Sequence, residues 1–163
     1  MEIHYHNRKK LEPNLELGAI YHKNIKNLFS VSDILSINCP ATKKTTNIIN
    51  AETLEYFPEG AVITNSARGD IIEDEAMVKA LKDKKIYALG LDVYKGEPNI
   101  HPGYLNHPNV FVLPHLGSAT KKTRINMANL AINNIEEFFK TGTCKNQVNW
   151  IQPIVELYPV LLI

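Results

Sequence analysis

AVITNSARGD, residues 61–70, is a short apolar run followed directly by a polar segment. The apolar part, residues 61–65, is typical of a buried β-strand. The segment that follows the polar residues carries apolar side chains at helical spacing, namely Ala76, Met77, Ala80 and Leu81. A strand, a polar loop and a helix in this order form the repeating unit of parallel sheets covered by helices. This stretch therefore predicts an α/β fold.

The same alternation continues on both sides of residues 61–82. We expect further strands over residues 3–6, 34–39, 87–93 and 110–113. We expect helices over residues 25–31, from residue 50, over 73–82 and over 120–140. The last of these is the longest and is marked by Ile125, Ala128, Ile132, Ile135 and Phe139. Ser118 or Thr120 can cap it, and a loop over residues 95–109 separates the last two strands.

Polar clusters follow three of the predicted strands directly. They are residues 65–70, 91–98 and 113–120, and they contain Arg68, Glu97 and His115 respectively. The carboxyl ends of parallel strands meet at one edge of a sheet, which is where open α/β sheets bind their ligands. A guanidinium, a carboxylate and an imidazole at that edge form a usable set for a substrate that bears a carboxylate.

The three clusters also carry a family resemblance. They read N-x-A-R-G-D, G-L-D-V-x-x-x-E-P and P-H-x-G-S-A-T, with Ser32-Asp33-Ile34 and Pro40-Ala41-Thr42 upstream. In this order they resemble the D-isomer-specific 2-hydroxyacid dehydrogenases, and the glyoxylate and hydroxypyruvate reductase branch in particular. The similarity extends from Met1 to about Asn149.

The resemblance implies a catalytic role for each of the three residues. Arg68 would hold the carboxylate of a 2-oxo acid. His115 would exchange a proton with the carbonyl oxygen, and Glu97 would orient the imidazole and favour its charged form. The structural alternatives are a surface ion pair for Arg68, a loop charge for Glu97 and a turn residue for His115.

The resemblance also implies a nicotinamide cofactor. Asp92 would accept from the nicotinamide carboxamide, with a strand-end turn former as the alternative. The other implied cofactor residues are Pro40, Thr46, Ala67, Gly117 and Ser118.

The end of the first strand favours NADP over NAD. Relatives that use NAD usually place an acid there, whereas this chain has Asn7, Arg8, Lys9 and Lys10. Asn7 and these cations would accommodate a 2′-phosphate. NAD remains the alternative cofactor, because Arg8 to Lys10 also fit a solvated basic turn.

The chain departs from the usual pattern of the family. No G-x-G-x-x-G occurs among its 163 residues, so the loop that holds the pyrophosphate is not in this sequence. The expected fold is a partial Rossmann-like doubly wound parallel sheet that lacks the first strand, the glycine loop and the first helix. The expected domains are an incomplete cofactor domain over residues 1–118, a long helix over 119–145 and a tail over 146–163.

Two functions are compatible with these features. One is an oxidoreductase, or part of one, that transfers hydride between NAD(P)H and a small 2-oxo acid such as glyoxylate or hydroxypyruvate. It would be inactive without an amino-terminal half. The other is a non-catalytic remnant or interaction module that retains the scaffold. In either case we expect the missing half or a homo-oligomer as partner, because an incomplete sheet exposes strand edges.

Charge and composition exclude several other classes. Lys and Arg number 18 and Asp and Glu 17, so no net field favours nucleic acid or an anionic membrane. The amino terminus has no signal-like apolar run, which predicts a cytoplasmic protein. The remaining histidines have no spacing typical of a metal site, and none is expected.

Overall fold

The structure is a computed structural model that describes residues 1–148. Its described part falls into two compact units, Met1–Gly117 and the segment from Ser118 onward. Residues 149–163, most of the tail predicted over 146–163, lie outside the described residues.

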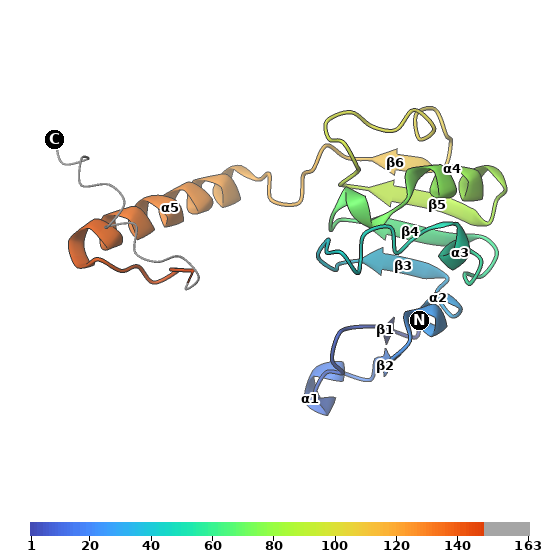
Figure 1. The fold of residues 1–163 in the computed structure, drawn as a ribbon, viewed down its shortest axis with the longest axis horizontal. Helices are drawn as coiled ribbons and strands as arrows, with labels where there is room; N and C mark the ends of the chain where they lie inside the picture. Colours follow the sequence, from blue (N-terminus) through green and yellow to red (C-terminus); the bar gives the residue numbers. More distant parts are fainter. Residues whose placement is uncertain (149–163) are drawn as a thin grey trace. The chain divides into compact units, whose positions relative to one another are not determined.

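A four-stranded parallel sheet forms the centre of the first unit (Figure 1). Its strands, in spatial order, are β3 (Ile34–Ile37), β4 (Ala61–Asn65), β5 (Ile86–Leu91) and β6 (Val110–Val112). In register, Ile37 lies beside Asn65 and Asn65 beside Leu91. The four predicted strands are confirmed, and their carboxyl ends share one edge of the sheet as expected.

A second, two-stranded parallel sheet lies near the amino terminus. It pairs β1 (His4–Tyr5) with β2 (Ile20–Tyr21), and α1 (Pro13–Glu16) lies between them in sequence. The β1 strand was predicted, whereas α1 and β2 were missed. Two residues are too few to show the alternation that marks a strand, and four are too few to show a helical period.

Three helices and one turn of 3-10 helix pack on the four-stranded sheet. They are α2 (Ile25–Phe29), α3 (Ala51–Leu54), η1 (Gly69–Ile71) and α4 (Asp74–Lys82). The core between α4 and the sheet contains Met77, Ile63 and Leu89, each at most 1% exposed. Full burial of such a side chain contributes about 1.5–3 kcal/mol. This core fixes the strand ends that carry the polar clusters.

Only one face of the four-stranded sheet is covered within residues 1–117. Leu35, Ile63 and Leu89 form a buried row, whereas side chains of the alternate rows are exposed or half-buried. The exposed rows include Ile34 and Phe111, which are 63% and 67% exposed. We call this side the open face. Parallel sheets are usually covered by helices on both faces, so within residues 1–117 the cover of this sheet is incomplete on the open face.

The second unit contains α5 (Lys121–Thr141). The Thr120 hydroxyl accepts a hydrogen bond from the Thr123 amide at 3.1 Å, and Gly142, with φ 76°, ends the helix. This confirms the long helix and selects Thr120 over Ser118 as its cap. None of its residues is buried. No helix in residues 1–148 is both long and apolar enough to cross a bilayer.

Candidate active site

Arg68 is presented by a turn that Asn65 shapes. Asn65 is 1% exposed, and its side-chain amide donates to the Arg68 carbonyl at 2.8 Å while its oxygen accepts from the Ala67 amide at 3.0 Å. A buried polar side chain with both groups satisfied fixes the backbone around it. The exposed side chain of Arg68 is thereby carried at the carboxyl end of β4.

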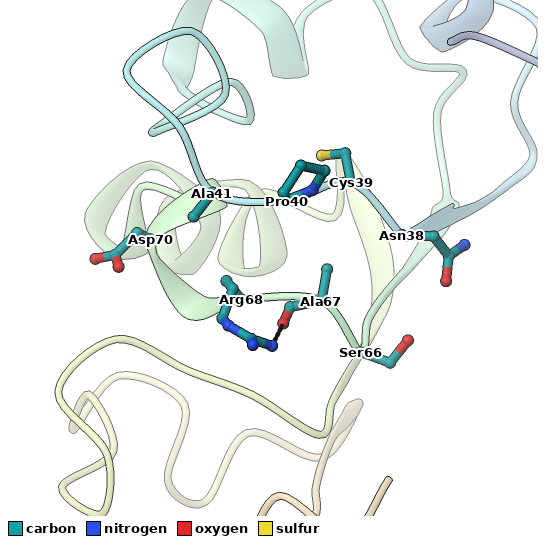
Figure 2. Close-up of a pocket in the computed structure, with 8 residues that line it drawn as sticks. All are labelled: Asn38, Cys39, Pro40, Ala41, Ser66, Ala67, Arg68 and Asp70. Carbon is teal, nitrogen blue, oxygen red and sulfur yellow. Dashed lines mark hydrogen bonds between the residues drawn. The ribbon is translucent and has the colours of Figure 1, made fainter. Parts of the chain in front are cut away.

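A cavity of about 690 Å³ lies beside this turn. Figure 2 shows its lining, in which residues from the segment after β3 and from the segment after β4 contribute. The Arg68 guanidinium donates through Nη1 to the Ala67 carbonyl at 2.6 Å. The volume is in the range of small-molecule sites. Of the residues predicted to bind substrate or cofactor, this cavity brings together Pro40, Ala67 and Arg68.

Glu97 and His115 form a hydrogen-bonded pair. Glu97 Oε2 and His115 Nδ1 lie 2.8 Å apart, and Glu97 Oε1 accepts from the Tyr94 amide at 3.1 Å. An ionised carboxylate can only accept, so the proton of the pair lies on Nδ1 of the imidazole. Within residues 1–148, Nε2 of His115 has no hydrogen-bond partner and is the nitrogen left for a ligand.

The pKa of Glu97 is lowered from its ordinary value. The hydrogen bond from His115 is the largest cause, and the Tyr94 amide, the His115 charge and the Arg68 charge act in the same direction. Partial burial opposes them. The carboxylate therefore stays ionised at neutral pH.

His115 has a left-handed backbone, with φ 55°. Asp92 holds the loop that follows, because Oδ1 accepts from the Leu116 amide at 2.6 Å and Oδ2 from the Gly117 amide at 2.9 Å. Non-glycine residues adopt this conformation rarely and often at functional sites. Asp92 thus makes the structural contacts that the turn-former alternative requires, and a lone pair remains on each oxygen for a cofactor amide.

The other predicted cofactor residues lie elsewhere. Asn7 and Arg8 follow β1 and are exposed, with the Arg8 amide donating to the Asn7 side chain at 2.8 Å. Thr46 donates its hydroxyl to the Thr42 carbonyl at 2.9 Å. Ser118 opens the second unit. None of these four lines the cavity beside Arg68.

Two of the remaining histidines are not isolated surface residues. His4 Nδ1 and His22 Nε2 lie 2.8 Å apart, and both side chains are partly buried. The parallel pairing of β1 with β2 brings them together, so the prediction that missed β2 also missed this contact. No cluster of three or more metal-ligating side chains occurs in residues 1–148.

Two positioning features were not assigned from the sequence. Asn65 has a role in the Arg68 turn, and the Tyr94 amide holds one oxygen of Glu97. A buried asparagine at the end of an apolar strand was the available signal for the first, because such a side chain must be satisfied locally. The second depends on a backbone amide, which sequence does not distinguish.

Comparison with known proteins identifies the family. Residues 1–117 match the family model described as D-isomer specific 2-hydroxyacid dehydrogenase, NAD binding domain. The chain belongs to this family. The D-isomer-specific 2-hydroxyacid dehydrogenase resemblance and the partial Rossmann-like fold predicted from sequence are thereby confirmed.

Individual reductases are similar to the chain in sequence and in structure. A 4-methyl-2-oxopentanoate reductase A of Aspergillus oryzae is 39% identical over 142 residues, 87% of this chain and 43% of that protein. A glyoxylate reductase from Paecilomyes thermophila is 41% identical, with a TM-score of 0.83 over 91% of this chain and 45% of that one.

An NADPH-dependent glyoxylate/hydroxypyruvate reductase from Sinorhizobium meliloti, solved with NADP and malonate, is 34% identical, with a TM-score of 0.84. The match covers 91% of this chain and 46% of that one. The chain therefore spans less than half the length of these three reductases.

Proposed function

We propose that the chain supplies part of the cofactor domain and the acid–base residues of an enzyme that reduces a small 2-oxo acid. Glyoxylate or hydroxypyruvate is the proposed substrate and NADPH the proposed reductant. The observation that carries the proposal is the 2.8 Å hydrogen bond between Glu97 and His115, at the sheet edge that also carries Arg68. The names of the similar reductases agree with this substrate class.

His115 is the proposed proton donor. Glu97 holds the proton on Nδ1, so Nε2 faces the ligand and gives its proton to the carbonyl oxygen as that oxygen gains charge. Glu97 also stabilises the imidazolium electrostatically. In the direction of oxidation, Nε2 would remove the same proton from the hydroxyl.

Arg68 is the proposed carboxylate-binding residue. Its planar guanidinium offers two parallel donors to a carboxylate, and the cavity beside it has room for a small acid. Substrate binding would replace the 2.6 Å bond from Arg68 to the Ala67 carbonyl.

A bound nicotinamide cofactor would supply the hydride. The residues of this chain fit part of such a cofactor, because Pro40 and Ala67 line the cavity and the exposed Asn7 and Arg8 offer donors to a 2′-phosphate. Thr46, Asp92, Gly117 and Ser118 are proposed as further contacts. NAD is the alternative cofactor if the basic residues after β1 only face solvent and do not contact a 2′-phosphate.

A partner is part of the proposal, because the chain has no glycine-rich loop for a pyrophosphate. The partner is either an amino-terminal half like that of the relatives or a second copy of the chain. The cytoplasmic location expected from the sequence stays a prediction.

Complementation tests the proposal. The full chain would be mixed with the separately produced amino-terminal half of a similar glyoxylate reductase, and NADPH oxidation by glyoxylate would be followed. We expect activity in the mixture, and a loss of about 100-fold or more for His115→Ala. Arg68→Lys should chiefly raise KM. His107→Ala, a loop histidine outside the site, is the matched control and should keep activity.

The second candidate is a non-catalytic interaction module. The absence of the glycine-rich loop from the 163 residues favours it for the chain by itself. A complemented chain that binds neither NADPH nor glyoxylate, and whose assembly is unchanged by His115→Ala, would support this alternative over the enzyme.

A further inference from the structure

Two loops of the proposed active site touch at Gly69. A side-chain carbon built on Gly69 would lie within 2.5 Å of the Tyr94 carbonyl oxygen and closer still to the Tyr94–Lys95 peptide bond. Real side-chain carbons do not approach backbone this closely. The φ of Gly69 is outside the left-handed range, so other residues could adopt its backbone conformation. Lack of space alone requires glycine here.

The contact joins the segment that carries Arg68 to the segment that carries Glu97. Arg68 directly precedes Gly69, and its carbonyl is held by Asn65. On the other side, the Tyr94 amide donates to Glu97 Oε1, and Oε2 of the same carboxylate pairs with His115. The path from Gly69 to the imidazole thus passes through the Tyr94 backbone, from its carbonyl to its amide, and then through one carboxylate.

We infer that Gly69 is a positioning residue, whose missing side chain sets the spacing between the Arg68 guanidinium and the Glu97–His115 pair. A methyl group at this position has to push the Tyr94–Lys95 peptide away, because the three nearest atoms all belong to the backbone of that peptide and cannot rotate aside as the end of a side chain could. Displacement of that peptide also moves the Tyr94 amide, which lies on the other side of the Tyr94 Cα, and Glu97 follows through its hydrogen bond to this amide. The inference rests on the proposed function only where it takes this spacing to matter for catalysis.

Gly69→Ala in the full chain tests the inference, with Gly90→Ala as its matched control. A carbon on Gly90 would meet only the Thr64 side chain, at an ordinary 3.4 Å from its methyl carbon, and Gly90 lies in a strand outside the site. The readout is the titration of the Glu97 side-chain carboxyl carbon by NMR, without substrate or cofactor. We expect the Glu97 pKa to rise toward its ordinary value in Gly69→Ala and to be unchanged in Gly90→Ala.

A double-mutant cycle with Arg68→Gln separates spacing from general loosening. In the wild-type background, Arg68→Gln should raise the Glu97 pKa because it removes a nearby positive charge. In the Gly69→Ala background this increase should be smaller, because the two groups lie farther apart. A folded Gly69→Ala variant with an unchanged Glu97 titration and an unchanged effect of Arg68→Gln would overturn the inference.

A measurement on the wild-type chain covers the case in which Gly69→Ala does not fold. The NMR resonances of the Gly69 amide and of Arg68 Nε should shift with pH at the midpoint of the Glu97 titration. The reason is that the contact between Gly69 and the Tyr94–Lys95 peptide transmits the change in charge and position of Glu97. If neither resonance reports that midpoint, the inference fails. These readouts need no partner or ligand, so a failed complementation assay would leave them standing.

Discussion

Asp92 holds the loop next to His115 through both of its carboxylate oxygens. Its two oxygens accept from the amides of Leu116 and Gly117 at 2.6 and 2.9 Å. We expect Asp92→Ala to lower the free energy of unfolding by about 2 kcal/mol, because hydrogen bonds to a charged acceptor are lost. Urea unfolding would measure it. Asp83→Ala, which removes only the exposed pair with Lys79, should cost less than about 1 kcal/mol. Equal costs would contradict this role for Asp92.

Glu97 makes the free energy of unfolding of the chain depend on pH in the acidic range. Its folded pKa is lowered, chiefly by the hydrogen bond from His115, so the stabilisation it provides is complete above its unfolded pKa. It is lost as pH falls through the folded pKa. The difference in unfolding free energy between wild type and Glu97→Gln should therefore shrink from about pH 5 downward. Chemical denaturation at a series of pH values would measure this difference.

The His115→Ala background provides the control for the acid dependence. There the largest cause of the lowered Glu97 pKa is gone, so the effect of Glu97→Gln should depend less on pH. A difference that is flat with pH in the wild-type background, or that grows in acid, would show that the pair is not formed in solution.

Among single residues, the sequence predicted that Glu97 and His115 lie close together, but not the backbone contacts that position them. Glu97 and His115 follow strands whose ends share an edge, and the parallel topology therefore brought them together. The contacts of Tyr94 and Gly69 involve backbone atoms of loops, whose paths no periodicity records. The close approach at Gly69 could not have been distinguished from an ordinary turn glycine.

At the scale of elements, length decided what the sequence could predict. The strand over Ala61–Asn65 and the helix over Asp74–Lys82 are long enough to show their periods, and both were predicted to within one residue. The pair of two-residue strands is defined by hydrogen bonds between them, so β2 had no signal of its own. For the same reason, the sequence did not predict the contact between His4 and His22.

The two units differ in what their apolar residues contribute. Ile63 in β4 is fully buried, whereas Ile132 in α5 is 52% exposed. We expect Ile63→Val to lower the free energy of unfolding by about 1 kcal/mol, because a buried methylene is removed from a packed core. The matched change Ile132→Val should stay within about 0.5 kcal/mol. Urea unfolding at low protein concentration measures both.

Association of the chain is the alternative outcome for α5. A cost for Ile132→Val that equals that of Ile63→Val, and that grows with protein concentration, would show that the helix is packed against another chain in solution. That result would contradict the exposed state of α5 described above and would favour a second copy as partner.

At the scale of the whole molecule, the sequence predicted an incomplete doubly wound sheet, and the open face described within residues 1–117 agrees with that prediction. Doubly wound sheets carry helices on both faces, and in residues 1–117 the helices cover one. The incomplete sheet was predictable because the recognisable G-x-G-x-x-G motif does not occur in the sequence. How far each side chain of that face is exposed, as at Ile34 and Phe111, required coordinates.

The open face should drive association of the chain with itself. It includes a hollow of about 200 Å³ bounded in part by Phe111, Gly90 and Leu113, and its edge strand β6 exposes Phe111 at 67%. Exposed apolar patches and uncovered strand edges both favour contact between copies. We expect sedimentation velocity to show a concentration-dependent increase in mass that Phe111→Lys reduces, because a charge in that hollow cannot be desolvated cheaply. Asn27→Lys adds the same charge on α2, away from the face, and should leave association unchanged. If both variants reduce it equally, net charge rather than the open face controls the assembly of the chain.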